Sequence, residues 1–393
     1  MSDYSYEKKF DAVIVGAGVI GCSIAYFLAR ESQGKFKVGV IERNTVGEES
    51  SSGAAGMLAA QIECESGGPF LELSIRSRAL FDWIAPELKE ISNVDIEYVK
   101  SGIGSIAFNS EDEKEIKARL DWQKKDGLKC EWRTSQQLSK QFPFLASNSL
   151  GGFWVPEDGQ VSAHRLTLAF SEAAKKLGVR FFENESFDRL ALKEGKIDFL
   201  ETNLSKFLAE KFIFAAGAWT GELLGKLAPV EPVKGQILIF GMPASWRKAH
   251  DWQSPLYVGK TAGPSPIHCY FVPKTDGHLL LGATSENRGL DKSISKIATD
   301  KMAEYACKIF PELASFPFKG VWAGLRPGSQ DHLPILGLVP QFKNVYAASG
   351  HFRNGILLSP ITGKLFAELF LEGRTSFPLD PFSPERFLKN GVV

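Results

Sequence analysis

The 393-residue chain contains only five cysteines, and no two of them form a Cys-x-x-Cys pair. Closely spaced cysteines mark structural zinc sites and the disulfide frameworks of small secreted proteins. We therefore expect no metal site, and a chain that folds in the reducing cytoplasm. The five residues are Cys22, Cys64, Cys130, Cys269 and Cys307.

The chain also lacks an excess of charge of either sign, because 46 Lys and Arg balance 46 Asp and Glu. Without a net charge there is no long-range field to attract nucleic acid or an anionic membrane, and neither is expected as a partner. The sequence has no low-complexity segment, heptad array or internal repeat. A chain of this length can bury a large core and is expected to divide into two domains.

One long uncharged run, Ala12–Ala29, follows Lys8 and Lys9. A signal peptide or a membrane span can have this form. However, the three glycines of the run suit a phosphate-binding turn better than a lipid-facing helix, and the next stretch completes a β-α-β unit instead of a cleavage site. We therefore expect a soluble protein without a membrane span.

The strongest pattern in the chain is this opening unit. Asp11–Val15 is an apolar, β-branched run typical of a buried parallel strand. Gly16, Gly18 and Gly21 follow in Gly-x-Gly-x-x-Gly spacing. This spacing permits a tight turn, a close approach of pyrophosphate to a helix N-terminus, and close packing of the helix on the sheet. Glu42 ends a second strand, where an acid accepts hydrogen bonds from a ribose. Together they predict a dinucleotide site rather than a chance glycine turn.

Two later stretches of small residues favour the same site. Ser50–Met57 is either a surface loop or a segment that presses against a flat ring or a pyrophosphate, and its apolar continuation favours the second. Lys211–Trp219 again reads as a strand followed by glycine, and leads into a helix. Such a junction either returns the chain to the dinucleotide-binding sheet, which we favour, or is an ordinary strand end.

The second half of the chain differs in character. Short apolar runs at regular spacing predict an antiparallel sheet and a second domain. These runs are Gln236–Phe240, Pro255–Val258, Cys269–Val272 and Leu279–Leu281. In the first half, Val94–Phe108 is expected to form two strands around its glycines.

Two residues in this half could bind a small acid. Arg326 lies in an apolar run, so its guanidinium is either paired with an internal acid such as Asp331 or available to a substrate carboxylate. The residues alone give the two alternatives equal weight. Tyr270 offers a phenol from an apolar strand, where packing is the more frequent role.

Seven stretches carry a family resemblance: GAGVIG, SSGAAGML, AAGAW, HCYFVPK, HLLLGAT, WAGLRPG and AASGHFRNGILLSPITG. Together they resemble the glycine oxidase family of flavoenzymes, which is allied to the D-amino-acid and sarcosine oxidases. The similarity runs along nearly the whole chain, and the last two stretches are the most specific.

The resemblance implies an α/β fold plus an antiparallel sheet, with a discontinuous, Rossmann-like FAD-binding domain and a second, substrate-binding domain. The FAD-binding domain is expected to comprise residues 1–88, 158–230 and 321–393, and the substrate-binding domain residues 89–157 and 231–320.

The resemblance also assigns roles to single residues. Arg326 and Tyr270 are expected to hold the substrate carboxylate, and Arg353 to lie at the pocket beside the flavin, serving either substrate or cofactor. Met57 is expected to contact both. FAD is expected to contact Gly16, Gly18, Val19, Ile20, Gly21, Glu42, Arg43, Ser50, Ser51, Ala55, Gly56, Met57, Phe187, His351, Phe352, Arg353, Asn354, Gly355, Ile356 and Leu357.

Three departures from the family pattern bear on substrate size and cofactor attachment. The stretch Tyr257–His268 is longer than usual, and Ser285 stands where the family often has a bulky apolar residue. No cysteine follows Cys307, whereas the covalent sarcosine oxidases carry one in the loop that matches residues 325–333. FAD is therefore expected to bind without a covalent bond.

The implied activity is FAD-dependent oxidative deamination of glycine and other small amines, such as sarcosine and small D-amino acids. Hydride would pass to flavin N5, O₂ would become H₂O₂, and the 2-oxo acid would leave with ammonia or methylamine. The family can also supply thiazole synthesis for thiamine, and it suggests a cytoplasmic homotetramer. Two alternatives stay open: a D-amino-acid dehydrogenase that passes electrons to a quinone, and a non-catalytic FAD-binding regulatory module.

Overall fold

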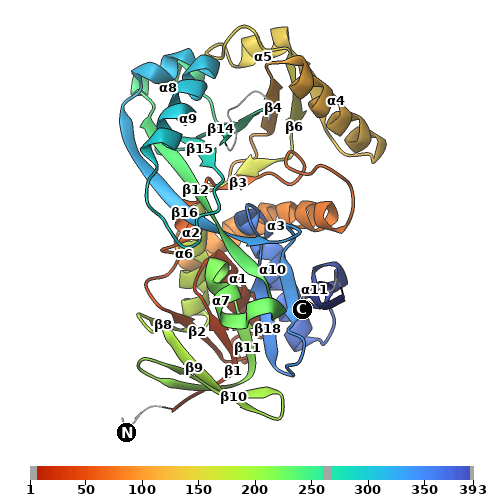
Figure 1. The fold of residues 1–393 in the computed structure, drawn as a ribbon, viewed down its shortest axis with the longest axis vertical. Coiled ribbons are helices and arrows are strands. Elements are labelled where there is room, and N and C mark those ends of the chain that lie inside the picture. Colours follow the sequence, from red (N-terminus) through yellow and green to blue (C-terminus); the bar gives the residue numbers. More distant parts are fainter. Residues whose placement is uncertain (1–6, 260–266, 390–393) are drawn as a thin grey trace.

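The computed structural model describes residues 7–259 and 267–389, which build two large sheets arranged one above the other (Figure 1). The first sheet has the strand order β17-β18-β11-β1-β2-β8, and the hairpin β9–β10 extends it from β11. Its strands are β1 (Glu7–Val15), β2 (Val38–Glu42), β8 (Arg180–Glu183), β9 (Phe187–Lys193), β10 (Lys196–Thr202), β11 (Lys206–Phe214), β17 (Ile335–Leu338) and β18 (Val345–Ser349).

The centre of this sheet is parallel, as the opening unit predicts. β1 pairs in parallel with both β2 and β11, and β11 pairs in parallel with β18. Val15 lies opposite Ile41 on one side and Phe214 on the other. The carboxyl ends of these strands therefore meet at one edge, which is where ligands bind in sheets of this kind.

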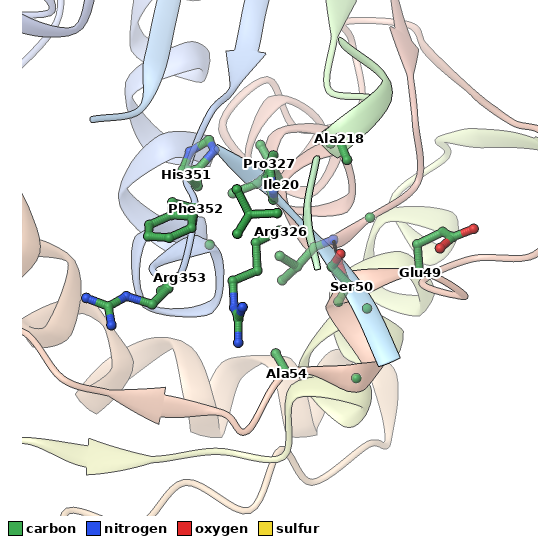
Figure 2. Close-up of a pocket in the computed structure, with 18 of the residues that line it drawn as sticks. Ile20, Glu49, Ser50, Ala54, Ala218, Arg326, Pro327, His351, Phe352 and Arg353 are labelled. Carbon is green, nitrogen blue, oxygen red and sulfur yellow. Dashed lines mark hydrogen bonds between the residues drawn. The ribbon is translucent and has the colours of Figure 1, made fainter. Parts of the chain in front are cut away.

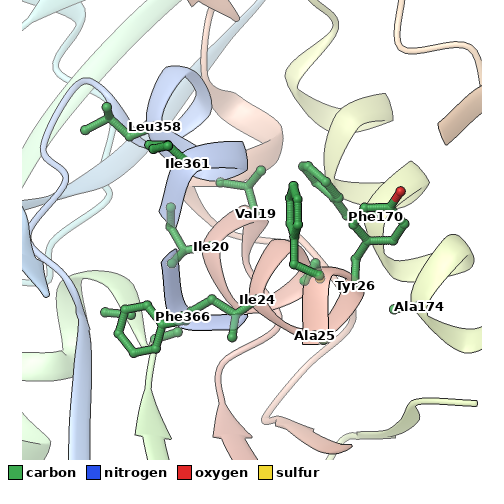
Figure 3. Packing of buried hydrophobic residues seen from close by; sticks show 14 of the residues in the cluster. Val19, Ile20, Ile24, Ala25, Tyr26, Phe170, Ala174, Leu358, Ile361 and Phe366 are labelled. Carbon is green, nitrogen blue, oxygen red and sulfur yellow. The ribbon is translucent and has the colours of Figure 1, made fainter. Parts of the chain in front are cut away.

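One face of the first sheet packs against the β9–β10 hairpin and Leu224, and four helices cover the other face. They are α1 (Val19–Glu31), α3 (Pro69–Ser92), α6 (Ala163–Lys176) and α10 (Gly355–Leu371). α1 is buried from Val19 to Ala29 and lies between α10, through Leu358 and Ile361, and α6, through Phe170 (Figure 3). A helix apolar on all sides is stable only inside such a layer.

The second sheet has the order β16-β12-β15-β14-β13-β4-β6-β5. It is expected to be antiparallel, and it is so except that β13 pairs in parallel with β4. Its strands are β4 (Ile103–Ala107), β5 (Glu131–Thr134), β6 (Gly151–Val155), β12 (Val230–Gly241), β13 (Leu256–Val258), β14 (Ile267–Pro273), β15 (His278–Thr284) and β16 (Phe318–Ser329). An aromatic cluster that includes Phe144, Trp252 and Phe310 fills the space between this sheet and its helices.

The smaller elements complete the fold. The helices around the second sheet are α4 (Ser110–Lys125), α5 (Ser135–Gln141), α8 (Ala244–His250) and α9 (Lys296–Ile309). The remaining helices and strands are α2 (Ser50–Gly53), α7 (Thr220–Leu224), α11 (Glu385–Lys389), β3 (Met57–Leu58) and β7 (Gly159–Gln160), with 3₁₀ turns at Gly217–Trp219, Gly225–Leu227, Pro311–Ser315 and Asp380–Phe382.

Two sequence-based expectations differ from the fold. Of the two strands expected in Val94–Phe108, only β4 forms, because Val99 and Gly102 bond instead to the turn that carries Asp158 and Gln160. Val321–Ser329 belongs to β16, which pairs with β12 of the second sheet, although the predicted division gives these residues to the FAD-binding part. The other boundaries of that division stay a proposal.

The uncharged run Ala12–Ala29 divides between β1 and α1. Within residues 7–259 and 267–389, no helix combines the length and apolar character that a membrane crossing requires. The same residues hold no group of three or more His, Cys, Asp or Glu that could bind a metal ion.

Candidate active site

A cavity of ≈ 870 Å³ lies where the carboxyl edge of the first sheet meets the second sheet (Figure 2). One part of its wall comes from the glycine turn, the end of β2, the 49–57 segment and the start of α10. The other part comes from β12, β14, β15 and β16. The cavity is therefore shared between a dinucleotide-type half and a half formed by the second sheet.

The glycine turn brings the N-terminus of α1 to the cavity. Gly16, Gly18, Val19 and Ile20 all line it. The Val19 N–H donates to Ser51 Oγ (2.9 Å), which ties the turn to α2. Gly21 lies behind the lining. A Cβ there would stand 2.0 Å from the Gly16 carbonyl oxygen, so only glycine permits the close helix packing that its spacing predicts.

Glu42 ends β2 with its carboxylate fixed on the backbone. Its two oxygens accept from the N–H groups of Ala17 (2.8 Å) and Asn44 (3.0 Å). A carboxylate has about four acceptor positions, so the two bonds leave about two further positions on a residue that lines the cavity. The side chain thus meets the condition for binding a ribose hydroxyl.

Arg43 is held at the cavity edge by two residues that the sequence-based assignment omitted. Its guanidinium lies 3.8 Å from the centre of the Trp219 ring and 3.0 Å from Glu49 Oε1. Trp219 ends the AAGAW stretch, which the sequence places near the cofactor without naming this side chain. An arginine stacked on indole gives a flat, cationic border to the dinucleotide half.

Arg326 is a buried cation in the second half of the cavity. Nη1 donates to the Thr284 carbonyl (3.0 Å), and the guanidinium also bonds to the Tyr270 phenol. It lies against Gly235, where a Cβ would stand 2.2 Å from Nη2. The pKa of Arg326 is lowered, mainly by burial.

The pairing of Arg326 with Asp331, one of the two sequence-based alternatives, is wrong. Asp331 instead pairs with Arg386 (2.7 Å). Within the described ranges, no carboxylate forms an ion pair with Arg326. A buried guanidinium in this state favours binding of an anion.

Tyr270 is a proton donor beside this guanidinium. Burial raises its pKa to about 12, although Arg326 acts in the opposite direction. Its phenol therefore stays protonated at neutral pH. Tyr270 and Arg326 lie on β14 and β16, which are separated by β15 and β12 in the second sheet.

Arg353 lies in the same part of the cavity but is balanced by a carboxylate. Its Nε is 3.7 Å from Glu63 Oε2, and Tyr257 donates a hydrogen bond to Glu63 Oε1. Figure 2 shows Arg353 and Arg326 reaching into one space. Glu63 and Tyr257 were not assigned from the sequence; the only signal was that Glu63 follows the SSGAAGML stretch closely.

His351 has a buried nitrogen without a partner. Its Nε2 is 3.1 Å from Thr362 Oγ1, whereas Nδ1 has no hydrogen-bond partner in the part of the chain that the structure describes. Burial lowers the pKa of His351 to about 3, so the ring is neutral. The residue lines the cavity, but Nδ1 itself is buried within the protein.

Most of the expected site residues meet at this cavity. All but Gly21 and Leu357 line it, and Leu357 is instead a core residue, 1% exposed. Ser285 also lines it, and the longer Tyr257–His268 stretch lies partly outside the described residues, at 260–266. Further lining residues that the sequence-based assignment omitted include Glu49, Glu63, Trp219, Tyr257, Asn287, Trp322 and His332.

The two halves of the cavity define the class of protein. A dinucleotide-type site at strand ends is suited to a redox cofactor, and the arginine opposite is suited to an acid, an arrangement typical of an oxidoreductase. A family model described as FAD dependent oxidoreductase matches residues 11–369, and the chain belongs to this family. The protein is therefore an FAD-dependent oxidoreductase, which sets aside the non-catalytic alternative.

Two relatives illustrate what the chain is similar to. The chain is 35% identical to the glycine oxidase of Geobacillus kaustophilus (strain HTA426), over 98% of the chain and 99% of that protein. It is 33% identical to the bifunctional protein ThiO/ThiG of Synechocystis sp., over 97% of the chain and 55% of that protein. The crystal structure of the Geobacillus kaustophilus glycine oxidase superposes with a TM-score of 0.89 at 33% identity, over 96% of this chain and 99% of that one.

FAD is the cofactor, and the residues present fit it. The small residues Ala54, Ala55 and Gly56 leave room for a flat ring at the cavity wall. Ser50 is fixed by donating to the Leu325 carbonyl. Glu42 and the α1 N-terminus are suited to the ribose and pyrophosphate.

Proposed function

We propose that the protein oxidises glycine and other small amines, including sarcosine and small D-amino acids, with FAD as electron acceptor. The observation that carries the proposal is Arg326, a buried guanidinium with a tyrosine partner and no recorded ion pair within the described ranges. The relatives named glycine oxidase support the choice of a small amino acid.

In the proposed mechanism, Arg326 and Tyr270 hold the substrate carboxylate. Arg353 is balanced by Glu63, with Glu65 also in the lining, so the charge without an ion pair among the described residues here is that of Arg326. An amino acid with a neutral amine carries one negative charge and balances it. FAD supplies a two-electron acceptor for the hydride of the α carbon.

In this mechanism the side chains of the cavity accelerate hydride transfer mainly by positioning the substrate. Tyr270 stays protonated and can donate throughout the neutral range, while Glu63 keeps Arg353 and Tyr257 in place at the facing wall. These contacts fix the substrate so that its α C–H faces the flavin, which removes the entropic cost of alignment. The imine product then hydrolyses to the 2-oxo acid and ammonia or methylamine.

For the acceptor of the electrons, we propose O₂, with H₂O₂ as the product. We also propose that the imine can supply thiazole synthesis for thiamine, supported by the resemblance to about half of a ThiO/ThiG protein (55% of its length). The competing proposal is a D-amino-acid dehydrogenase that passes electrons to a quinone. A cytoplasmic homotetramer, proposed from family resemblance, is checked separately by light scattering of the purified protein.

Anaerobic reduction of the purified holoprotein tests the proposal. Glycine, sarcosine and D-alanine, added in turn, should bleach the visible flavin band, and admission of air should restore it with stoichiometric H₂O₂. Bleaching without peroxide, reversed by a soluble quinone, would instead favour the dehydrogenase. If no small amine bleaches the flavin while dithionite does, the proposed substrate class is wrong.

A further inference from the structure

A buried lysine behind the cofactor half of the cavity has no role in the proposed chemistry. Lys274 directly follows Pro273, the last residue of β14, at the hairpin that leads to β15. Its Nζ donates to three oxygens, those of Ala55 (2.9 Å), Val161 (2.9 Å) and the Gln160 side chain (3.0 Å). All three ammonium hydrogens therefore have acceptors, and none of these acceptors is charged.

The amide of Gln160 is fixed in this arrangement. Its Nε2 donates to the carbonyls of Pro273 (2.9 Å) and Gln253 (2.6 Å), which turns its oxygen towards Lys274. In residues 7–259 and 267–389, no carboxylate forms an ion pair with Lys274, and burial lowers its pKa to about 8. A buried cation without a carboxylate partner is costly, and here the three hydrogen bonds of the ammonium offset that cost, one of them to the Ala55 carbonyl.

The backbone that Lys274 binds is part of the cavity wall. Ala55, Gly56 and Met57 line the cavity, whereas Lys274 lies behind them. Gly56 has φ +81°, and a Cβ there would stand 2.0 Å from the Val161 carbonyl oxygen. Its carbonyl, which belongs to the next peptide, Gly56–Met57, accepts from the Val161 N–H (2.8 Å), so the peptides on both sides of Gly56 are held.

The Ala55–Gly56 peptide connects the lysine to the cofactor side. Across a planar trans peptide, the C=O and N–H point in opposite directions. Since the Ala55 carbonyl points to Lys274, the Gly56 N–H points towards the cavity, and no acceptor for it is recorded among the described residues. A cation on the carbonyl polarises the peptide and strengthens its N–H as a donor.

We propose that Lys274 is a positioning residue for the flavin: it holds the Ala55–Gly56 peptide so that the Gly56 N–H faces bound FAD, and its charge favours the reduced cofactor. The hairpin that carries Tyr270 thus also tunes the flavin. The inference rests only on FAD as the cofactor. It can therefore fail or succeed independently of the choice of substrate.

The test separates charge from hydrogen bonding with two variants. Lys274→Gln keeps a donor without the charge, and Lys274→Arg keeps the charge. Lys301→Met, which removes an exposed cation on α9, is the matched control. The flavin midpoint potential of each holoprotein is measured at pH 7 without substrate.

Lys274→Gln should change the ratio of reduced to oxidised flavin at least tenfold towards oxidised, which is ~30 mV for a two-electron couple. Lys274→Arg and Lys301→Met should stay within threefold of wild type. A wild-type potential in Lys274→Gln would overturn the proposal.

If Lys274→Gln purifies without flavin, FAD affinity replaces the potential as the measured quantity. A dissociation constant raised at least tenfold in Lys274→Gln but not in Lys274→Arg supports the positioning role. Equal loss of affinity in both variants would overturn the proposal, because side-chain shape rather than charge would then decide.

Discussion

At the scale of single residues, the two arginines of the cavity differ in how their charge is balanced. Arg353 has the Glu63 carboxylate 3.7 Å away, whereas Arg326 has a carbonyl and a phenol. A buried guanidinium loses its hydration, and only an anion replaces it fully. Arg326 is therefore the residue that gains most when a carboxylate enters.

Replacing Arg326 should impair catalysis without loss of the cofactor. Arg326→Ala should retain FAD but lower kcat/KM for glycine by about 2–4 kcal/mol of transition-state stabilisation, the scale of removing one partner of a buried charged pair. Steady-state kinetics and flavin content check this. Arg386→Ala, which breaks the ion pair with Asp331 outside the cavity, is the control and should keep kcat/KM near wild type. Unchanged kinetics in Arg326→Ala would place the carboxylate elsewhere.

The buried His351 should make stability depend on pH. Its folded-state pKa of about 3 lies below the ordinary 6.5, so the unfolded state binds the proton first as pH falls. This contribution to stability is complete above pH 6.5 and is lost at about 1.4 kcal/mol per unit as pH falls towards 3. The free energy of unfolding, measured with urea between pH 7 and 5, should fall less steeply with falling pH in His351→Gln than in wild type. His278→Gln, at a half-exposed histidine outside the cavity, should keep the wild-type pH dependence, and equal pH dependence in all three proteins would refute the assignment.

At the scale of elements, the segment that leads from β3 to Glu63 is held by a buried pair. The Asp158 carboxylate accepts from the N–H groups of Gln61 (3.3 Å) and Ile62 (3.1 Å). It also binds Arg78 of α3 at 2.5 Å. Asp158 is fully buried. The pair therefore fixes the backbone immediately before Glu63.

Breaking this pair should cost both stability and substrate binding. Asp158→Asn leaves Arg78 without its main partner and should lower the free energy of unfolding by about 3 kcal/mol. It should also raise KM several-fold, because Glu63 loses its support. Glu157→Gln removes the half-exposed second partner of Arg78 and should cost no more than about 1 kcal/mol. Chemical denaturation measures the free energy of unfolding, and steady-state kinetics measures KM. Equal effects of the two variants would contradict the proposed role of the Asp158–Arg78 pair.

What the sequence predicts at this scale depends on how local the signal is. The opening unit was predictable because strand, glycine turn, helix and Glu42 follow one another in the chain. Glu63 and Tyr257 were not, because a contact across 194 positions leaves no spacing to read. The Asp331 alternative was wrong for the same reason: its partner, Arg386, stands 55 residues further on.

At the scale of the whole molecule, both sheets line the cavity, the first on the side proposed for the cofactor and the second on the side proposed for the substrate. Neither sheet alone closes the cavity, since its lining alternates between them along the chain. A cofactor bound there contacts both halves. Binding of FAD should therefore stabilise the molecule as a unit, by ~2.7 kcal/mol when its concentration is 100 times the dissociation constant.

The way FAD is held can be tested on the same molecule. None of the described residues that line the cavity is a cysteine, and burial raises the pKa of all five thiols. A thiol with a raised pKa forms little of the nucleophilic thiolate, so a covalent link to the flavin is disfavoured. Acid precipitation of the yellow holoprotein should release all the flavin into the supernatant. The stripped protein should recover its thermal midpoint on addition of FAD, with riboflavin as the control that lacks the pyrophosphate. Flavin that stays with the washed pellet would show that the attachment is covalent.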